Sequence, residues 1–235
     1  MSEAVKELFA GIAPRYDLLN RVLSARNDVR WRRRALELVQ GSPHSVLDLA
    51  CGTFDLALAA LSQGKAARVH GSDFCKPMLV AGAAKRQGHA LSACVGDALR
   101  LPYADGAFDL AMVAYGWRNF GDPALALREL KRVLRPGGQL LILEFLRPAT
   151  WWPRLFYATF GRLVFPFAGG VLAGNADAYR YLNQSIATFL SRPQAEELLL
   201  TTGFARPRWL SFCGGISHAV AATLPGEPPG PSAGA

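Results

Sequence analysis

Three acidic residues follow short apolar stretches, where carboxylates can hold a small polar ligand. Asp48 lies in VLDLACGT, Asp73 ends RVHGSD, and Asp97 follows LSACVG. If these stretches are parallel strands, their carboxyl ends meet at one edge of the sheet, where open α/β sheets bind ligands. Asp48 can accept hydrogen bonds from hydroxyl or ammonium groups. Asp73 follows it at about the spacing, roughly 20 residues, at which an acid on a second strand holds a ribose diol.

The turn Cys51-Gly52-Thr53 joins the first of these strands to a helix that begins near Phe54-Asp55. Backbone N–H groups at such a helix start can hold a ligand. An ordinary strand-to-helix connection has the same sequence pattern, so the turn alone does not show that a ligand binds there. A dinucleotide fingerprint would need GxGxxG here, and only Gly52 is present, which argues against NAD.

Apolar strands alternate with helices through the middle of the chain. This alternation predicts βαβ units in a mainly parallel sheet with helices on both faces. Asp122-Pro123 is a strong helix start, with Asp as N-cap and Pro at the first helical position. We expect strands over 46–50, 68–73, 91–95, 108–114 and 139–145, and helices over 56–62, 77–86 and 123–134.

The segments before and after this core predict a single domain over 1–224. Residues 1–43 form a helical N-terminal cap, with Pro14 interrupting its first helix and a basic helix over 29–39. The core occupies 44–146. An apolar, aromatic lid or substrate region occupies 147–192, including a helix over 177–190. A helix and a strand hairpin (208–212 and 216–222) complete 193–224, and the Pro/Gly-rich tail, 225–235, is expected to be disordered.

Composition narrows the classes of partner. The net charge of +8 admits nucleic acid, an anionic membrane surface or an anionic ligand, and the run Arg30–Arg34 is equally explained as a solvated helix face. The four cysteines and four histidines are scattered, so no disulfide framework and no metal site is expected. The acid-containing N-terminus is not a secretory signal, and no long apolar span appears, so we expect a cytoplasmic protein.

Several motifs occur together between Phe9 and His218. They are FAGIAPRYDLLNRVLS, DVRWRRRA, VLDLACGTFDLAL, GSDFCKPML, GDALRLPYADGAFDLAMVAYGWRNF, ALRELKRVLRPGGQLLILEF, AYRYLNQSI and GGISHAV. In this combination the chain resembles the C-methyltransferases of menaquinone and ubiquinone biosynthesis, within the class I S-adenosylmethionine-dependent methyltransferases. The resemblance implies a Rossmann-like α/β fold with a seven-stranded, mostly parallel sheet and helices on both faces.

The resemblance also implies site residues, position by position. The residues matching the family's cofactor contacts, together with the strand-end acid, are Asp48, Gly52, Thr53, Asp73, Phe74, Asp97, Ala98 and Ala114. Ala114 stands where many relatives carry a serine, so one hydroxyl contact is missing. The residues matching those that face the reacting ring are Tyr16, Arg118 and Asn119.

The implied reaction methylates a ring carbon of a prenylated quinol, either demethylmenaquinol or the equivalent ubiquinone precursor, with S-adenosylmethionine as cofactor. The hydroxyl beside that carbon loses its proton, and a phenolate is then a good carbon nucleophile. Because a guanidinium stays protonated in proteins, Arg118 is expected to stabilise the phenolate or order a water rather than act as a base. The prenyl tail predicts peripheral contact with the inner face of the cell membrane. Nucleic acid is not an expected partner, and a homodimer is compatible with the sequence.

Phe54 departs from the family pattern, which has glycine there because glycine lets the backbone approach the cofactor closely. A ring that points into the cleft would occupy cofactor space, whereas one that points away would leave the loop intact. This leaves a catalytically impaired homologue that binds a prenylated ligand or a partner as the alternative function. A methyltransferase for another lipid or aromatic acceptor is a further alternative.

Overall fold

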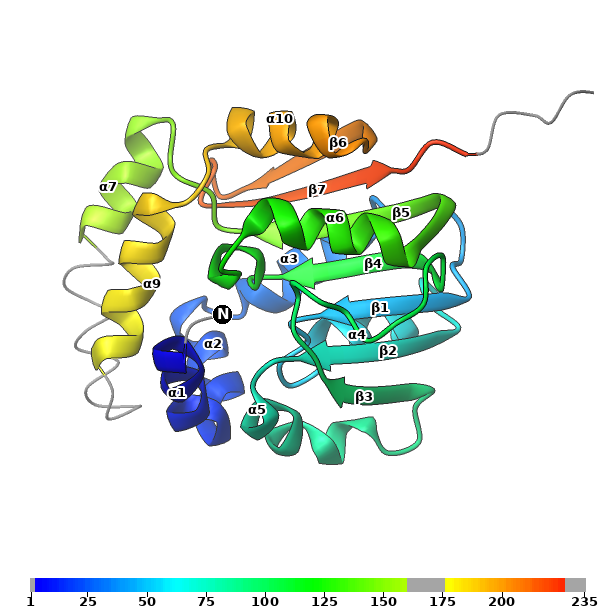
Figure 1. Ribbon diagram of the computed structural model, residues 1–235. Helices are drawn as coiled ribbons and strands as arrows, with labels where there is room; N and C mark the ends of the chain where they lie inside the picture. Colours follow the sequence, from blue (N-terminus) through cyan, green and yellow to red (C-terminus); the bar gives the residue numbers. More distant parts are fainter. Residues whose placement is uncertain (1–2, 160–175, 227–235) are drawn as a thin grey trace, which may run out of the picture.

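The computed structural model describes residues 3–159 and 176–226, and its centre is a seven-stranded sheet in the order β3-β2-β1-β4-β5-β7-β6 (Figure 1). The pairs from β3 to β5 are parallel, and β7 runs antiparallel to both β5 and β6. The strands are β1 (Ser45–Leu49), β2 (Arg68–Asp73), β3 (Leu91–Val95), β4 (Phe108–Ala114), β5 (Leu134–Glu144), β6 (Ala205–Phe212) and β7 (Ser217–Thr223). The predicted Rossmann-like class with helices on both faces is confirmed.

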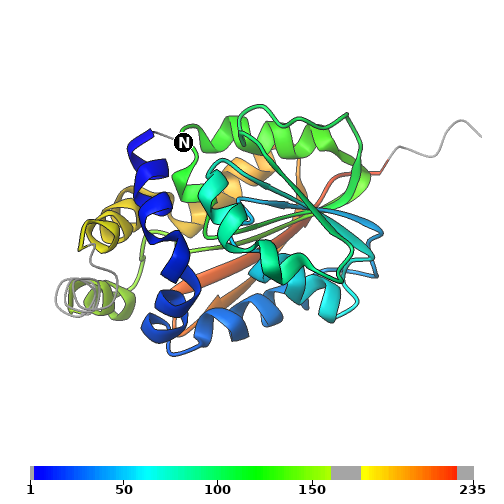
Figure 2. The same cartoon turned by 90° about the horizontal axis from the view of Figure 1, so that it is seen from below.

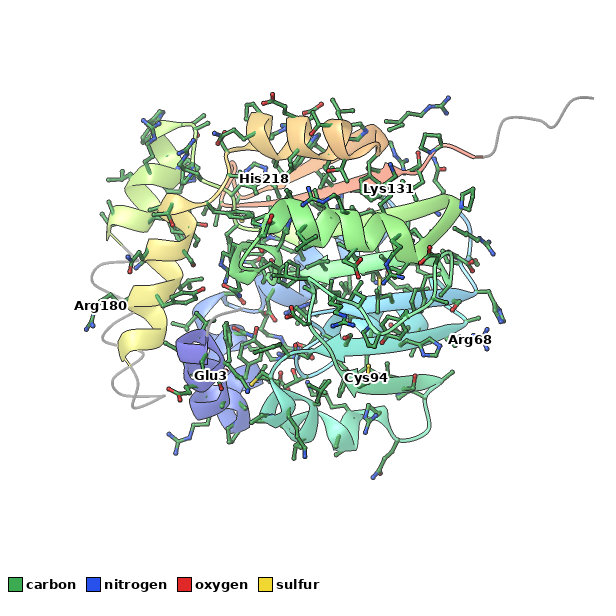
Figure 3. All side chains as sticks on the ribbon, viewed as in Figure 1. Glu3, Arg68, Cys94, Lys131, Arg180 and His218 are labelled. Atoms are coloured by element: carbon green, nitrogen blue, oxygen red, sulfur yellow. The ribbon has the colours of Figure 1, made fainter. Side chains whose placement is uncertain are left out.

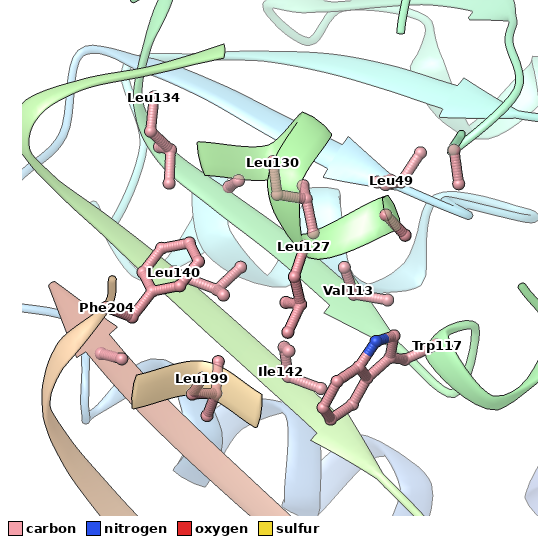
Figure 4. Close-up of a cluster of buried hydrophobic side chains, with 14 of the residues drawn as sticks. Leu49, Val113, Trp117, Leu127, Leu130, Leu134, Leu140, Ile142, Leu199 and Phe204 are labelled. Carbon is pink, nitrogen blue, oxygen red and sulfur yellow. The ribbon is translucent and has the colours of Figure 1, made fainter. Parts of the chain in front are cut away.

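Helices cover both faces of the sheet because β1, β2, β4 and β5 bury apolar side chains. On one face, α3 (Asn27–Leu36) and α4 (Asp55–Ser62) pack through Trp31, Leu36 and Leu56. On the other, α6 (Pro123–Val133) and α10 (Arg192–Thr202) enclose the cluster drawn in Figure 4, which includes Trp117. Figure 2 shows α3 and α6 on opposite sides of the sheet.

The bounds of α6 follow the sequence prediction within one residue, but the strand after it begins earlier than expected. Asp122 Oδ1 accepts hydrogen bonds from the N–H groups of Ala124 and Leu125, both at 2.9 Å. The helix ends at Val133, and β5 begins at Leu134 instead of the expected residue 139. Leu134 already pairs with Phe108, and an irregularity in the ladder accommodates the Pro-Gly-Gly segment that follows.

Two other elements differ from their expected bounds. The single helix expected over 77–86 is divided into α5 (Lys76–Ala81) and η2 (Ala83–Arg86). At Gly82, between them, an added Cβ would lie 2.7 Å from the Phe54 ring and 2.8 Å from the Thr53 Cα, so the chain bends where only glycine fits. β6 begins at Ala205 because this residue pairs with Thr223, across a register shift.

The carboxyl ends of β1, β2 and β4 are covered by the N-terminal helices and by two helices from the second half of the chain (Figure 1). The N-terminal helices α1 (Glu3–Ile12), η1 (Ala13–Arg15) and α2 (Tyr16–Leu23), called the cap below, lie there with α7 (Trp151–Thr159) and α9 (Ala176–Thr188). In Figure 3, Glu3 and Arg180 mark this end, and Arg68 marks the opposite one.

The expected lid falls partly on residues 160–175, which lie outside the described residues, as does the tail from 227 onward. Within the described residues, none of the helices combines the length and the apolar character needed to cross a bilayer.

Candidate active site

Asp73, the last residue of β2, closes the turn that follows β1. Its Oδ2 accepts a hydrogen bond from Gly52 N, and its Oδ1 accepts one from Cys75 N, both at 2.8 Å. Burial raises the pKa of this carboxyl, and the two backbone hydrogen bonds partly offset that effect. Because each carboxylate oxygen can accept a second hydrogen bond, Asp73 can hold the turn and still accept from a ligand hydroxyl.

Asp48 in β1 carries an acceptor without a partner. Its Oδ2 accepts a hydrogen bond from Ala57 N at 3.1 Å. Its Oδ1 is buried and has no hydrogen-bond partner among the residues that the structure describes. Burial raises the pKa of the Asp48 carboxyl to about 8. A buried, unpaired carboxylate oxygen at the ligand edge suits a donor with positive charge, such as an ammonium group.

The turn itself is held by the cap. Gly52 has a φ of +52°, which glycine adopts without strain. Thr53 is buried, and its Oγ1 donates a hydrogen bond of 2.6 Å to Asp17 Oδ1 in α2. The predicted cofactor residues Gly52 and Thr53 therefore lie beside Asp73, with the Thr53 hydroxyl already engaged by a residue that the sequence did not single out.

The Phe54 ring points into the protein interior. Phe54 has a φ of +72° and is 0% exposed. An added Cβ on Gly71 would lie 3.1 Å from this ring and one on Gly82 would lie 2.7 Å from it, so two glycines make the space that the ring fills. The Arg86 guanidinium lies 5.4 Å from the ring centroid. The ring therefore takes no part in lining the described cavities.

The remaining predicted cofactor residues lie around this turn and beyond β3. Phe74 is half-buried, with the Lys6 ammonium 5.2 Å from its ring centroid. Asp97 Oδ1 accepts a hydrogen bond from Leu99 N at 3.0 Å, and Ala98 is buried. Ala114 is the last residue of β4. No group of three or more metal-ligating side chains occurs in the described part of the chain.

An apolar cavity of about 350 Å³ lies between the cap, α3, α7, α9 and the loops after β4 and β5. This volume is within the range of small-molecule sites, about 300–1,000 Å³. The polar side chains that line it include Tyr16, Asn20, Arg32, Tyr115, Arg118 and Tyr181. Burial raises the pKa of Tyr16, an effect that the charges of Arg32 and Arg118 partly offset.

Arg118, in η3 (Trp117–Asn119), is held by Glu144 at the end of β5. Its Nη1 donates to Glu144 Oε1 at 2.5 Å and to the Tyr115 carbonyl at 2.7 Å, and its Nε donates to Ser185 Oγ at 3.3 Å. The Arg118 side chain is 5% exposed and that of Glu144 is 1% exposed. Nη2 has no hydrogen-bond partner among the side chains that the structure describes, which leaves it available to a ligand in the cavity.

Asn119 lies behind this cavity wall. Its Oδ1 accepts a hydrogen bond of 2.9 Å from the Tyr181 hydroxyl, and its Nδ2 donates to the Tyr115 carbonyl at 3.4 Å. Tyr16 and Arg118 both line the cavity, whereas Asn119 reaches it through Tyr181.

The sequence did not single out two residues that build this site, Arg32 and Glu144. Arg32 is buried, pairs with Asp28 at 2.8 Å, and lies 5.6 Å from the Tyr115 ring. Glu144 is an acid at the end of a strand, as Asp48 and Asp73 are, so the same sequence pattern could have identified it. Arg32 lies in a run of arginines whose other members are all exposed, so the sequence gives no sign that it is buried.

Comparisons with known proteins identify relatives of this chain. Residues 1–223 match the sequence model of the ubiE/COQ5 methyltransferase family. The chain is 45% identical to a demethylmenaquinone methyltransferase of Thermus thermophilus, covering 84% of this chain and 91% of that protein. It is 33% identical to the ubiquinone/menaquinone biosynthesis C-methyltransferase UbiE of Bdellovibrio bacteriovorus, covering 94% of this chain and 96% of that protein.

Solved structures share the fold at lower identity. A possible histamine N-methyltransferase from Thermotoga maritima is 18% identical with a TM-score of 0.68, covering 92% of this chain and 98% of that one. A Haemonchus contortus phosphoethanolamine N-methyltransferase bound to S-adenosyl-L-methionine is 16% identical with a TM-score of 0.62, covering 83% of this chain and 52% of that one.

Proposed function

Because this chain belongs to the ubiE/COQ5 methyltransferase family, we propose that its acceptor is demethylmenaquinol, a naphthoquinol with a prenyl tail. The chain is an S-adenosylmethionine-dependent C-methyltransferase that acts on a quinone-type ring. The observation that carries the proposal is the apolar cavity lined by Tyr16 and Arg118 at the same end of the sheet as Asp48 and Asp73. Relatives named for demethylmenaquinone favour a naphthoquinol over a benzoquinol.

The residues at the sheet edge fit S-adenosylmethionine. Asp48 offers a buried, unpaired oxygen for its ammonium group, and Asp73 offers acceptors for its ribose hydroxyls. Gly52, Thr53, Phe74, Asp97, Ala98 and Ala114 complete the proposed cofactor contacts. When bound, the cofactor supplies an electrophilic methyl group on a positively charged sulfur.

Arg118 is proposed to stabilise the deprotonated ring hydroxyl beside the carbon that is methylated. A guanidinium stays protonated in proteins and cannot accept the proton, but its Nη2 can donate a charge-assisted hydrogen bond to the phenolate. Glu144 already accepts hydrogen bonds from Arg118 Nη1, Arg118 N and Phe145 N. Glu144 therefore orients Arg118. Water takes the hydroxyl proton, and after methyl transfer the methylated ring carbon loses its own proton, which restores the aromatic ring.

Tyr16 and Asn119 are proposed to position the ring. Tyr16 lines the cavity from the cap, and burial keeps its hydroxyl protonated by raising its pKa. Asn119 orients Tyr181, which lines the cavity, through the hydrogen bond of 2.9 Å. Correct placement contributes much of the rate when the nucleophile is already a reactive phenolate.

The alternative function, a catalytically impaired homologue, rested on Phe54. Because the phenyl ring is fully buried against Gly71 and Gly82, it does not argue against cofactor binding.

The experiment that tests this proposal is a methylation assay. The purified protein is mixed with S-adenosylmethionine labelled in its methyl group and with demethylmenaquinol of short tail, kept reduced by dithionite. We expect label on the naphthoquinol ring and much slower labelling of a polyprenyl benzoquinol. Faster labelling of the benzoquinol, or no labelling of either ring, would overturn the proposed acceptor.

Two variants test the role of Arg118 in the same assay. Arg118→Ala should lower turnover by about a hundredfold or more, while S-adenosylhomocysteine affinity, measured by calorimetry, stays within about twofold. Arg128→Ala, an exposed arginine on α6, is the matched control and should keep full turnover. Loss of S-adenosylhomocysteine binding in Arg118→Ala would contradict a role at the ring.

We also propose that the protein binds the membrane surface through α7. Trp151, Trp152 and Leu155 are 73%, 46% and 47% exposed, and Arg154 is exposed on the same helix. Phe156 and Tyr157, also on α7, line the apolar cavity. A helix with exposed tryptophans and an arginine suits the boundary between lipid and water, and this one would bring the cavity to the bilayer that holds the prenyl tail.

A further inference from the structure

A continuous set of ion pairs joins the N-terminal helices to the start of α4. It lies outside the apolar cavity except at its far end, where Asp28 and Arg32 line the cavity wall. Asp55 is central, with oxygens 2.9 Å from Lys85 Nζ and 3.1 Å from Arg21 Nη2. The members of the set are Asp17, Arg21, Asp28, Arg32, Asp55 and Lys85.

Asp17 is the member that touches the proposed cofactor turn. Its Oδ1 accepts the hydrogen bond of 2.6 Å from Thr53 Oγ1. Its Oδ2 pairs with Lys85 Nζ, which fixes the carboxylate from the other side. Hydrogen bonds to a charged partner are stronger than neutral ones, so this contact holds the Thr53 side chain in one orientation.

The residue before Asp17 in the chain is Tyr16, which lines the apolar cavity. Both residues lie in the first turn of α2. A displacement of Asp17 would therefore move Tyr16 as well, because neighbouring residues of a helix share a rigid backbone.

Side-chain packing also joins the cap to α5, because Ala13 is buried with Cys75 and Met78 and Tyr16 packs against this cluster. A cavity of about 550 Å³ lies between the cap and α5, and its walls include Asp17 and Thr53 together with Ala13, Pro77 and Val80. Beside this hollow, the hydrogen bond from Thr53 Oγ1 to Asp17 Oδ1 links the cap directly to the cofactor turn.

We propose that Asp17 is a positioning residue that couples the cofactor turn to the substrate cavity, so that binding of the cofactor and of the quinol strengthen each other. This inference rests on the proposed assignment of the Gly52-Thr53 turn to the cofactor and of the apolar cavity to the quinol. An ordered turn fixes Asp17 and thereby Tyr16, and a ring packed on Tyr16 fixes the turn in return. By thermodynamic linkage the two effects are equal in size.

The test measures binding alone, without turnover. S-adenosylhomocysteine is titrated calorimetrically into the native protein, with and without 1,4-naphthohydroquinone carrying one prenyl unit. We expect the quinol to tighten S-adenosylhomocysteine binding at least about fivefold, the lower range of typical coupling between sites. In Thr53→Val and in Asp17→Ala, the dissociation constant of S-adenosylhomocysteine without the quinol, divided by that with the quinol, should fall close to one.

The double variant and a conservative variant identify the contact. Thr53→Val combined with Asp17→Ala should lose no more coupling than either change alone, because both remove the same hydrogen bond. Asp17→Asn keeps an acceptor for Thr53 and should retain most of the coupling. Glu37→Ala, which removes an exposed ion pair with Arg34, is the control and should leave the ratio unchanged.

The inference would be overturned if the coupling persists in Thr53→Val, or if the native protein shows no coupling. If Asp17→Ala fails to fold, Thr53→Val decides alone, since it replaces one hydroxyl by a methyl group. A native protein that binds S-adenosylhomocysteine but not the quinol would instead contradict the proposed acceptor. Methylation of the quinol by a protein without coupling would leave the proposed function standing.

Discussion

At the scale of single residues, Phe54 anchors the cofactor turn from beneath. Its backbone has a φ of +72°, a conformation that costs a residue with a side chain about 1 kcal/mol or more relative to glycine. Its ring is fully buried against Gly71 and Gly82, and deleting a buried aromatic ring typically costs about 3–5 kcal/mol. The packing of the ring therefore outweighs the backbone strain.

Phe54→Gly should lower the free energy of unfolding by about 2–4 kcal/mol, the difference between these two effects. Urea unfolding measures it, and Phe54→Leu, which keeps part of the packing, should fall between the native protein and the glycine variant. S-adenosylhomocysteine should bind the glycine variant no more tightly than the native protein. Tighter binding with unchanged stability would mean that the ring obstructs the cofactor.

Asp48 makes the stability of the ligand-free protein depend on pH. Its pKa is about 8 in the folded protein and about 4 when the chain is unfolded. Between these values the folded protein binds more protons than the unfolded chain, so stability falls as pH rises. This loss of stability begins near the pKa of Asp48 in the unfolded chain and is complete once the pH exceeds its pKa in the folded protein.

The free energy of unfolding, compared between the native protein and Asp48→Asn from pH 5 to pH 9, isolates this effect. The native protein should lose stability relative to the variant up to about pH 8 and no further. His70 and His218, whose pKa values burial lowers, are present in both proteins and cancel in the difference. A difference that does not change with pH would show that Asp48 ionises normally.

At the scale of elements, α7 has two apolar sides with different neighbours. Phe156 and Tyr157 line the substrate cavity, and the Tyr157 hydroxyl donates to the Ile216 carbonyl at 2.8 Å. Trp151 and Leu155 are exposed, and they are one helical turn apart. The same helix thus connects the cavity wall with an exposed apolar surface.

Trp151→Ser combined with Leu155→Ser should weaken binding to phosphatidylglycerol vesicles by about tenfold or more, because the apolar area of two side chains is lost. Co-sedimentation with vesicles measures the effect. Leu200→Ser on α10, which removes an equally exposed leucine, is the control and should bind as the native protein does. Equal binding by the α7 variant would rule out this helix as the membrane contact.

At the scale of the whole molecule, the parallel sheet gathers the site from distant parts of the chain. β1, β2, β4 and β5 run in the same direction, so Asp48, Asp73, Ala114 and Glu144 reach one edge. The cap then covers this edge and supplies Tyr16 and Asp17. Helices from distant parts of the chain also meet there, because α1 and α9 are in contact.

Periodic apolar stretches and helix signals were sufficient to predict the sheet, its helices and the edge that carries the acids. These are local properties: Asp122-Pro123 starts a helix, and alternating strands and helices impose a parallel order. The motifs also indicated the family, since stretches such as APRYDLLN and LILEF can be recognised in the sequence itself. The individual site residues and the peripheral membrane contact remain predictions.

Only the tertiary structure decided where Phe54 points, because the space for its ring comes from Gly71 and Gly82, neither of which is adjacent to it in the chain. The tertiary structure also decided the burial of Arg32, whose neighbouring arginines are exposed. It likewise decided the hydrogen bond between Asp17 and Thr53, which lie 36 positions apart in the chain. A strand or a helix follows from neighbouring residues, whereas a contact between distant side chains depends on how those elements pack. The sequence by itself thus determined the fold and the family, and packing decided how the cofactor turn is held.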